Sequence, residues 1–455
     1  MGTHRASHWG LPNTIGGPIE DAVPNGTWLP FGNGRSYGDV CLNADGPAVR
    51  APTRVCFDLD GRILRASASL TLGDVLKRLE GTGLFPPVLP GTRHVTLGGA
   101  VANDIHGKNH HVAGTFARHV LALSLRRSDG TMLDLAAGDP LFTATLGGMG
   151  LTGLIETVTV RLERVPSSAI RQRVLPFADL AQLERLDAAE GHVTHAVAWI
   201  DSLATGSDFG RGHLILGEHA QAGPASCWQP ARLAVPFTPP MPLVSGPGLR
   251  AFNTLYRRTA GRAGEAVVAA SSFFFPLDAV GRWNRLYGPR GLHQHQSVVD
   301  DLATVERLLR TAAEAGHHSF LTVLKRFGSV PSPAPLSFPR PGWTLTLDFP
   351  DRGSRSRALV ERLDSVTLEA GGCVNPYKAR AMSGETFRAC FPQWHELEAH
   401  RDPNVMSDLW KRVLQRPQLA APPLSQVAVN QDSQPCLSAC NVKLPHDVSH
   451  DGDRS

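Results

Sequence analysis

The chain of 455 residues is longer than one hydrophobic core usually supports, which predicts two domains. Its composition, 42% hydrophobic and 19% charged, is that of an ordinary globular protein, and no run of about 18 apolar residues could form a membrane-spanning helix. The net charge of +4 permits attraction to phosphate or anionic lipid, but the lack of a Lys/Arg-rich tract argues against nucleic-acid binding.

The N-terminal part of the chain alternates between strand and helix patterns, after an irregular arm over residues 1–26. Thr71 is predicted to start a helix, because Asp74, three residues later, makes a partial capping box. A hairpin is expected around the turn Ser128-Asp129-Gly130. The predicted strands are Val55–Leu59, Arg62–Ala68, Val120–Arg126, Thr131–Leu135 and Ile155–Leu162.

Residues 166–391 have the mixed pattern of an α+β domain, with helical stretches such as Val305–Ala315 between strands. An insertion over residues 221–262 is dense in Pro and Gly and is expected to have little secondary structure. Residues 392–415 are predicted to be helical, and the polar tail 421–455 is expected to be disordered. The predicted strands of this part are Ala196–Ile200, Gln296–Val299 and Thr344–Asp348.

Three glycine-rich turns carry the strongest functional signal: Gly32–Asp39, Pro90–Gly107 and Gly147–Ile155. The first superficially suggests a dinucleotide-binding fingerprint, but its spacing differs and loop follows where a helix would be required. Such a turn can still present several backbone N–H groups to one pyrophosphate, although a plain glycine turn explains it equally well. Small residues let the backbone approach a flat ligand closely. Together the three turns predict one large, extended, phosphate-bearing ligand.

These turns resemble the FAD-binding domain of the vanillyl-alcohol-oxidase/p-cresol-methylhydroxylase superfamily. Within it, the run Asn103–His111 is similar to the decaprenylphosphoryl-β-D-ribose 2′-oxidase family, and the similarity extends from about Trp9 to about Leu414. Other matching segments are Trp283–Pro289, Pro335–Pro339, Pro341–Trp343 and Gly384–Phe387.

The resemblance implies an α+β, two-domain flavoenzyme. Residues 1–165, completed by about 392–420, would form a p-cresol-methylhydroxylase-type FAD-binding domain. Residues 166–391 would form a substrate-binding cap domain, built on an antiparallel sheet with flanking helices.

The implied reaction is the oxidation of a secondary sugar hydroxyl to a ketone by hydride transfer to flavin N5. The implied substrate is the 2′-hydroxyl of a polyprenyl-phosphoryl ribose, and a partner keto-reductase would complete its epimerisation to an arabinose precursor of cell-wall arabinan. Two alternatives stay open. One is an oxidase or dehydrogenase of a free sugar, alditol or aldonolactone, and the other is a non-enzymatic flavin electron carrier or lipid-sugar binding subunit.

The resemblance also implies individual site residues. Those expected against the FAD are Gly32, Asn33, Gly34, Arg35, Ser36, Tyr37, Gly38, Asp39, Gly91, Thr96, Leu97, Gly98, Gly99, Asn103, Asp104, Ile105 and His106. Those expected around the substrate are Lys108, Trp199, Gln294, Gln296, Lys325 and Thr346. The expected catalytic residues are Lys378, His106 and Tyr37.

Several positions depart from the family pattern. Covalent members of the superfamily often carry a histidine in the first glycine loop, where this chain has Arg35, which implies non-covalent FAD. The family's cysteine near the flavin is Thr346 here, and its neighbouring asparagine is Thr344. A tyrosine between the pocket glutamines is His295, and a tyrosine three residues before Lys378 is Asn375.

The residue types explain the implied roles. A fixed charge on Lys378 would stabilise an anionic reduced flavin, whereas the alternative is a solvated lysine. Lys325 lies in an apolar run, and a buried lysine needs an anionic partner. Gln294 and Gln296 alternate along one strand face and offer both donors and acceptors to sugar hydroxyls. His106 and Tyr37 are both candidates to orient or deprotonate the reacting hydroxyl.

The cluster His106, His110 and His111 raises a metal site as another possibility. Gly107 interrupts the helix that two ligands four residues apart would need, and no suitably placed acidic ligand follows. No metal is therefore predicted.

The seven cysteines are scattered without a C-x-x-C pair, which favours a reducing compartment. Residues 1–30 hold no run that resembles a signal peptide, so a cytoplasmic location, or one peripheral to the membrane, is expected. In the insertion 221–262, apolar side chains lie among prolines and precede several arginines, a combination that suits a bilayer surface. The alternative is a loop that packs on its own domain.

Overall fold

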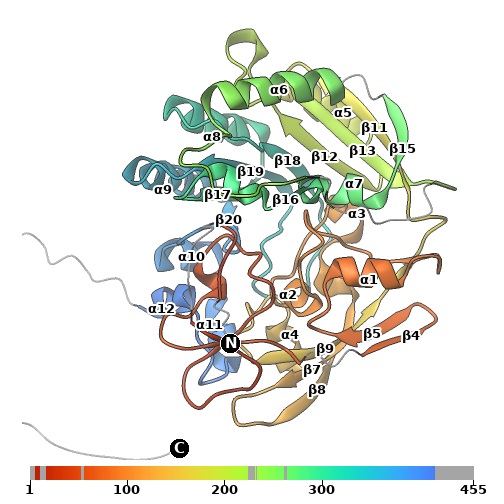
Figure 1. The fold of residues 1–455 in the computed structure, drawn as a ribbon, viewed down its shortest axis with the longest axis vertical. Helices are drawn as coiled ribbons and strands as arrows, with labels where there is room; N and C mark the ends of the chain where they lie inside the picture. The colour runs from red at the N-terminus through yellow and green to blue at the C-terminus, as the bar shows by residue number, and fades with distance from the viewer. Residues whose placement is uncertain are drawn as a thin grey trace, which may run out of the picture. The chain divides into compact units, whose positions relative to one another are not determined.

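The computed structural model describes residues 6–10, 17–52, 56–223, 231, 233–260 and 264–415. These residues fall within one compact unit of the chain that ends at residue 416, and the tail 421–455 lies outside them. Two large sheets organise this unit: a five-stranded sheet in the lower part of Figure 1 and an eight-stranded sheet in its upper part. Helices accompany both sheets, so the mixed α+β architecture is confirmed.

The five-stranded sheet is antiparallel, in the order β4-β5-β9-β7-β8. The predicted strands of this region are confirmed, with ends shifted by one or two residues. Its strands are β4 (Phe57–Asp60), β5 (Ile63–Ser67), β7 (Val120–Arg126), β8 (Met132–Ala136) and β9 (Leu154–Arg161). Helix α1 (Leu72–Arg78) starts where predicted, because Thr71 and Asp74 form a complete capping box.

Smaller elements surround this sheet. A three-stranded parallel sheet contains β1 (Ile19–Glu20), β3 (Ala48–Val49) and β2 (Leu29–Pro30), and β6 (Leu84–Phe85) pairs with β10 (Glu163–Arg164). The helices of this half are α2 (Leu97–Ala102), α3 (His110–Ala113), α4 (Pro140–Thr145), η1 (Asp39–Cys41) and η2 (Phe116–His119).

The C-terminal segment returns to this half of the molecule as α10 (Gly384–Cys390), α11 (Trp394–His400) and α12 (Asp408–Leu414). Helix α11 packs on α4 and α12 packs on η1. The expected helix over 392–415 is therefore two helices. Between them, buried Asp402 accepts hydrogen bonds from the backbone N–H and the hydroxyl of Ser128, and the following Pro403 opposes helix continuation.

The eight-stranded sheet is antiparallel throughout, in the order β15-β11-β13-β12-β18-β19-β17-β20. Its strands are β11 (Ile170–Phe177), β12 (His195–Ile200), β13 (Gly212–His219), β15 (Glu265–Val268), β17 (Leu292–Val299), β18 (Val323–Phe327), β19 (Gly342–Pro350) and β20 (Cys373–Val374). The helices of this half are α5 (Leu180–Ala189), α6 (Gly246–Ala260), α7 (Ala270–Phe274), α8 (Leu302–Glu314), α9 (Ser354–Glu369), η3 (Gly206–Asp208), η4 (Pro276–Ala279) and η5 (Trp283–Tyr287). The short strands β14 (Leu233–Ala234) and β16 (Val280–Gly281) pair in parallel.

The two faces of this sheet differ in chemistry because successive side chains on a strand point to opposite sides. One face is apolar: Leu324, Leu345 and Leu347 are buried in a hydrophobic cluster, and α8 and α9 pack on β17. The other face carries polar side chains at the alternate positions of three neighbouring strands. They are Gln294 and Gln296 on β17, Lys325 on β18, and Thr344, Thr346 and Asp348 on β19.

The insertion 221–262 contains more structure than expected, because α6 spans 15 of its residues. One face of α6 is formed by residues at helical spacing, namely Leu249, Phe252, Asn253 and Tyr256. This face packs on Phe320, whose ring centre lies 4.4 Å from that of Phe252. The prediction of low secondary-structure content was wrong here because the Pro and Gly residues stand at the helix start, where they are tolerated.

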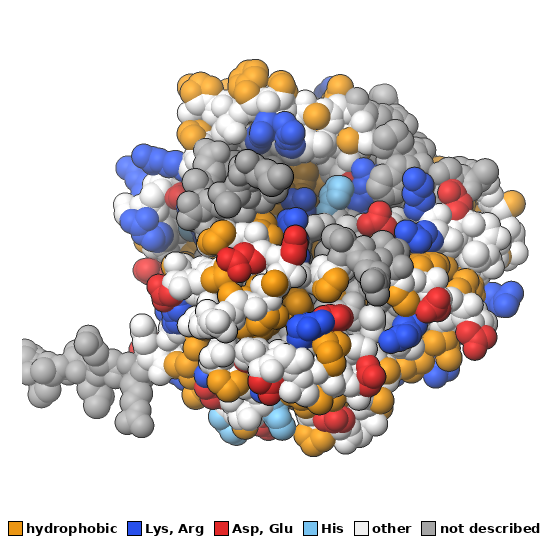
Figure 2. Space-filling model, turned by 60° about the horizontal axis from the view of Figure 1, so that its bottom comes forward, with side chains coloured by type: hydrophobic (Ala, Val, Ile, Leu, Met, Phe, Trp, Pro, Cys, Tyr) orange, Lys and Arg blue, Asp and Glu red, His pale blue; other side chains and the backbone are white. Residues whose placement is uncertain are grey.

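Among the described residues, no helix has both the length and the apolar character needed to cross a membrane. On the face drawn in Figure 2, Lys and Arg side chains are interspersed with Asp and Glu. The boundary expected near residue 165 falls between β10 and β11, but the division of the chain into two domains stays a prediction.

Candidate active site

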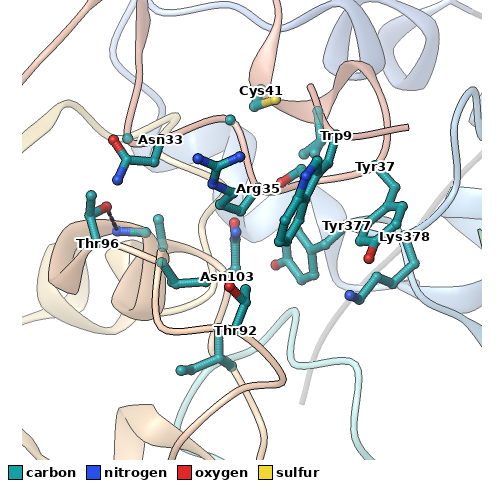
Figure 3. Close-up of a pocket in the computed structure, with 18 of the residues that line it drawn as sticks. Trp9, Asn33, Arg35, Tyr37, Cys41, Thr92, Thr96, Asn103, Tyr377 and Lys378 are labelled. Carbon is teal, nitrogen blue, oxygen red and sulfur yellow. Dashed lines mark hydrogen bonds between the residues drawn. The ribbon is translucent and has the colours of Figure 1, made fainter. Parts of the chain in front are cut away.

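A cavity of about 470 Å³ lies where the polar face of the eight-stranded sheet meets the glycine-rich turns. All three turns contribute to its wall, together with β17, β18 and β19 and the segment before α10. Figure 3 shows labelled side chains of the first two turns, of Trp9 and of the segment before α10 converging on one space. Of the expected site residues, the cavity wall includes Gly32, Asn33, Gly34, Arg35, Ser36, Tyr37, Gly91, Thr96, Gly98, Gly99, Asn103, Asp104, Ile105, His106, Gln294, Gln296, Lys325, Thr346 and Lys378.

The first glycine turn offers free backbone donors to the cavity. Within the described residues, no backbone N–H group from Gly32 to Ser36 donates to a protein acceptor. Gly34 has φ +58°, a conformation that favours glycine, and a Cβ there would lie 2.0 Å from the carbonyl oxygen of Ser7. The turn therefore presents unsatisfied N–H groups in the manner of an anion-binding nest.

The second and third turns are joined to each other. Thr96 caps α2 by accepting from the N–H of Gly99 at 3.1 Å. In the third turn, Gly147 and Met149 donate backbone hydrogen bonds to Val101 and Ala102 of α2. Both turns are thus held together beside the cavity, and their small residues leave room for a flat ligand against the backbone.

A row of alternating cationic and aromatic side chains in contact continues the wall from the first turn (Figure 3). The Arg35 guanidinium lies 4.8 Å from the Trp9 ring, and the Trp9 ring lies 6.1 Å from that of Tyr37. The Lys378 ammonium lies 4.4 Å from the centre of the Tyr37 ring. Burial raises the pKa of the Tyr37 phenol well above its ordinary value, so this phenol stays protonated.

Lys378 and Asp348 form the charged part of the site. Burial lowers the pKa of Lys378 to about 8, and the nearby Asp348 carboxylate opposes that shift. Burial raises the pKa of Asp348 to about 7, although one of its oxygens accepts a hydrogen bond from Gln294 at 2.6 Å. Its other oxygen is buried without a partner among the described residues. The positive charge of Lys378 and the negative charge of Asp348 therefore stabilise each other in the cavity wall.

His106 lies at the centre of a hydrogen-bond network. Its Nδ1 is 3.3 Å from Lys325 Nζ, and its Nε2 is 3.3 Å from Gln296 Nε2. The Phe327 ring packs edge-on against the imidazole at 4.8 Å. Burial, the largest cause, holds the pKa of His106 well below its ordinary value, so the imidazole is neutral.

Three residues expected at the FAD lie outside the cavity wall for clear structural reasons. Gly38 packs under the C-terminal segment, because a Cβ there would lie 2.0 Å from the carbonyl oxygen of Ala379. Asp39 pairs with Arg412 of α12 at 2.6 Å. Leu97 is buried in the hydrophobic core of the lower half. Asp104 does line the cavity, yet its carboxylate accepts hydrogen bonds from the hydroxyls of Ser332 and Ser337.

Two residues expected around the substrate also lie outside the wall. Lys108 donates to the backbone carbonyl of Phe273 and lies over that ring. Trp199 shares the polar face of the sheet, but it lies on β12, one strand beyond Lys325, where Tyr256 of α6 covers it at 4.9 Å. A direct substrate contact for these two residues stays a prediction.

Sequence reasoning missed several residues of the cavity wall, among them Trp9, Thr92, Asp278, Asp348 and Tyr377. Strand alternation could have found Asp348, which follows Thr346 by two residues and therefore shares its face. Asp278 carried no such signal. It reaches the wall from η4 and accepts hydrogen bonds from the hydroxyl of Thr92 and the N–H of Arg93.

The departures from the family pattern fall on both sides of the sheet. Thr346 and Asn375 line the cavity. Thr344 lies behind them and accepts a hydrogen bond from Gln296 Nε2 at 3.0 Å. His295 points to the opposite face, where its Nε2 is 3.1 Å from Asp364 of α9. Its change from tyrosine therefore does not alter the cavity.

Among the described residues, no group of three His, Cys, Asp or Glu side chains is arranged to hold a metal ion. His106 and His110 do not share a helical face, since α3 begins only at His110. Both nitrogens of His106 face protein groups.

Comparison with known proteins agrees with this site. Residues 22–136 match the family described as FAD binding domain. Over 406 residues the chain is 34% identical to decaprenylphosphoryl-beta-D-ribose oxidase of Mycolicibacterium smegmatis, covering 84% of this chain and 88% of that enzyme. It is 36% identical over 370 residues to an uncharacterized protein of Streptomyces coelicolor, covering 76% and 100%. A shorter match, 23% identical over 172 residues, links it to an alditol oxidase of a Streptomyces species, covering 36% and 41%.

Proposed function

Because the chain belongs to the family of decaprenylphosphoryl-β-D-ribose oxidase, we propose that it oxidises the 2′-hydroxyl of a polyprenyl-phosphoryl ribose to a ketone. The chain is an FAD-dependent oxidoreductase. One observation carries the proposal: a glycine-built nest, a polar sheet face with two glutamines and Lys325, and Lys378 of the segment before α10 share one cavity. The nest suits a pyrophosphate, and the polar face suits a hydroxylated sugar.

The residues that would hold FAD are those of the three turns. The N–H groups of Gly32 to Ser36, which have no acceptor in the part of the chain that the structure describes, suit the pyrophosphate. The small residues Gly98 and Gly99 allow close approach of a flat ring. When bound, FAD supplies a hydride acceptor at its N5 atom. In this proposal residues 1–165, with the returning segment 392–420, form the FAD-binding domain, and residues 166–391 form the substrate cap.

The substrate would lie against the sheet. Gln294 and Gln296 provide donors and acceptors for sugar hydroxyls, and Lys378 provides positive charge. Tyr37, whose phenol stays protonated, can donate a hydrogen bond to the substrate, and neutral His106 can position Lys325 beside the reacting hydroxyl. A keto-reductase that completes epimerisation would be the functional partner.

The test is anaerobic mixing of the yellow protein with a panel of alcohols: polyprenyl-phosphoryl ribose, free pentoses, alditols and aldonolactones. We expect the lipid-linked ribose to bleach the flavin absorbance at the lowest concentration. Preferential bleaching by an alditol would favour the second candidate, which the partial similarity to alditol oxidase supports. A flavin that none of these alcohols reduces would point to an electron carrier or a binding subunit.

We expect the FAD to be bound without a covalent link. Arg35 stands where covalent relatives often have histidine, and both nitrogens of His106 face protein groups. Cys41 also lines the cavity, but burial raises the pKa of its thiol to about 12, so the nucleophilic thiolate does not form at neutral pH. Acid precipitation should therefore release all yellow colour into the supernatant. Colour retained in the washed pellet would show a covalent bond.

Peripheral contact with a membrane is part of the proposal, because a polyprenyl tail resides in a bilayer. Three apolar side chains before α6 are largely exposed, namely Phe237 (67%), Met241 (66%) and Leu243 (51%). The basic side chains of α6 include Arg250, Arg257 and Arg258. Trp228, which the sequence also suggested for this contact, lies outside the described residues.

Changing Phe237, Met241 and Leu243 together to Ser should weaken binding to anionic phospholipid vesicles at low salt by at least about tenfold, since burying one such side chain contributes about 1.5–3 kcal/mol. Co-sedimentation measures the effect. The matched control changes Leu59, Ile63 and Met132 to Ser, because these side chains of the five-stranded sheet are also exposed. Equal sedimentation of both variants would mean that the segment before α6 does not contact lipid.

A further inference from the structure

The use of lysine in this chain is selective. Only six of its 45 basic side chains are lysine, and the others are arginine. Two of the six, Lys325 and Lys378, line the cavity. A guanidinium stays protonated at any ordinary pH, whereas a lysine in a protein interior can lose its proton. A chain that otherwise favours arginine thus places residues that can become neutral amines in its site.

A series of hydrogen bonds runs from the backbone N–H of Tyr377, which can only donate, to His106 beside Lys325. The backbone N–H of Tyr377 donates to Asn375 Oδ1 at 3.0 Å, so the amide nitrogen of Asn375 must point the other way. That nitrogen donates to Gln296 Oε1 at 2.9 Å. Gln296 Nε2 therefore faces Thr344 Oγ1 and His106 Nε2, to which it donates.

This chain of donors determines the tautomer of His106. An Nε2 atom that accepts from Gln296 carries no proton, so a neutral imidazole must carry its proton on Nδ1. The Nδ1–H then faces Lys325 Nζ, 3.3 Å away, and the backbone of Gly107 is a second hydrogen-bonding neighbour of the ring. An ammonium group has no acceptor to offer to that N–H, but a neutral amine has one.

The charges around Lys325 agree with this assignment. Among the described residues, Lys325 forms no ion pair with a carboxylate. The titratable groups that interact electrostatically with Lys325 are His106, His110, Lys108 and Lys378, and none of them carries a negative charge. Burial and Lys378 lower the pKa of Lys325 to about 7. Lys378 differs, because the Asp348 carboxylate favours its charged form.

We propose that Lys325, as a neutral amine positioned by the relay Tyr377–Asn375–Gln296–His106, is the general base that accepts the proton of the substrate hydroxyl. The O–H bond breaks and its proton passes to Lys325 Nζ, which becomes an ammonium. The carbinol C–H bond breaks, its hydrogen leaves with both electrons as hydride for the bound flavin, and the carbon–oxygen double bond forms. This inference rests on the proposed function, in that it assigns the base of that oxidation.

The relay depends on residues in which this chain departs from its family pattern. Asn375 and Thr344 both contact Gln296 directly. The roles of the two cavity lysines then divide: Lys378 stays charged beside Asp348, and Lys325 exchanges a proton.

The first test measures the protonation of Lys325 without any substrate. In the FAD-loaded protein with ¹³C- and ¹⁵N-labelled lysine, six side-chain signals can be followed by NMR against pH, and the Lys325 signal is assigned by its loss in Lys325→Arg. We expect Lys325 to titrate near 7, well below the ordinary lysine value of about 10.4. A Lys325 midpoint near 10 would overturn the proposal.

The second test compares Lys325→Met with Lys325→Arg in anaerobic flavin reduction at saturating substrate. Arginine keeps the charge but cannot accept a proton, so both variants should slow reduction by at least about 10²-fold, and a small primary amine should partly rescue only Lys325→Met. Near-normal reduction in Lys325→Arg would make the residue a simple cation for substrate binding and refute the base role. If no alcohol reduces the wild-type flavin, the proposed function fails, whereas the titration still decides whether Lys325 is a neutral amine.

Discussion

Replacing Lys378 with alanine should leave the protein yellow but slow the reduction of its flavin by about 10²–10³, the usual effect of removing one preorganised electrostatic group. Lys378 lines the cavity, lies over the Tyr37 ring at 4.4 Å and is paired electrostatically with Asp348. A fixed positive charge at this place stabilises the negative charge that hydride transfer creates. FAD content should change little, because the three glycine turns hold the cofactor in the proposed site.

The measurement is stopped-flow reduction under anaerobic conditions, with FAD content determined from the released flavin. Lys77→Ala is the matched control, because Lys77 is exposed on α1 and lies outside the cavity wall. Lys378→Arg should retain more activity than Lys378→Ala, since only the charge is required here. This pattern is opposite to that expected at Lys325. An unimpaired rate in Lys378→Ala would identify Lys378 as a residue without an electrostatic role in the reaction.

Gly34→Ala should weaken the affinity for FAD by on the order of 10²-fold, which corresponds to about 2.7 kcal/mol. Gly34 has φ +58°, and a Cβ there would lie 2.0 Å from the Ser7 carbonyl oxygen and 3.0 Å from the Phe31 ring. The first turn must therefore move away from the segment that carries Trp9, which lines the same cavity. Its N–H groups would then lose the arrangement that suits a pyrophosphate.

The matched control is Gly61→Ala in the turn between β4 and β5. Gly61 has φ +57°, almost the same conformation, but nothing lies within 4 Å of an added Cβ. Both variants carry the left-handed backbone cost of about 1–2 kcal/mol, and only Gly34→Ala adds the clash. We expect Gly61→Ala to purify with normal FAD content and Gly34→Ala to purify largely colourless. Equal FAD content in the two variants would show that the first turn does not contribute to cofactor binding.

The sequence by itself determined the local elements and the parts of the site that depend on local rules. The Thr71–Asp74 capping box and the hairpin around Gly130 formed where their residues predict, because capping and turn formation need only neighbouring residues. The three glycine turns were recognisable for the same reason, and all three line one cavity. Gln294 and Gln296 lie on the same face of β17, as predicted, because side chains two positions apart in any strand point to the same side.

Only the tertiary structure decided which of these residues share a site. Trp199 and Lys325 lie on the same face of the sheet. Helix α6, which was not predicted, covers Trp199, whereas Lys325 lines the cavity. Asp278 reaches the wall by binding Thr92, 186 positions away in the chain. The proton state of Lys325 depends on a relay through Tyr377, Asn375, Gln296 and His106, which come from three distant segments. Such contacts follow from sheet register and packing between remote elements, and local periodicity contains no information about either.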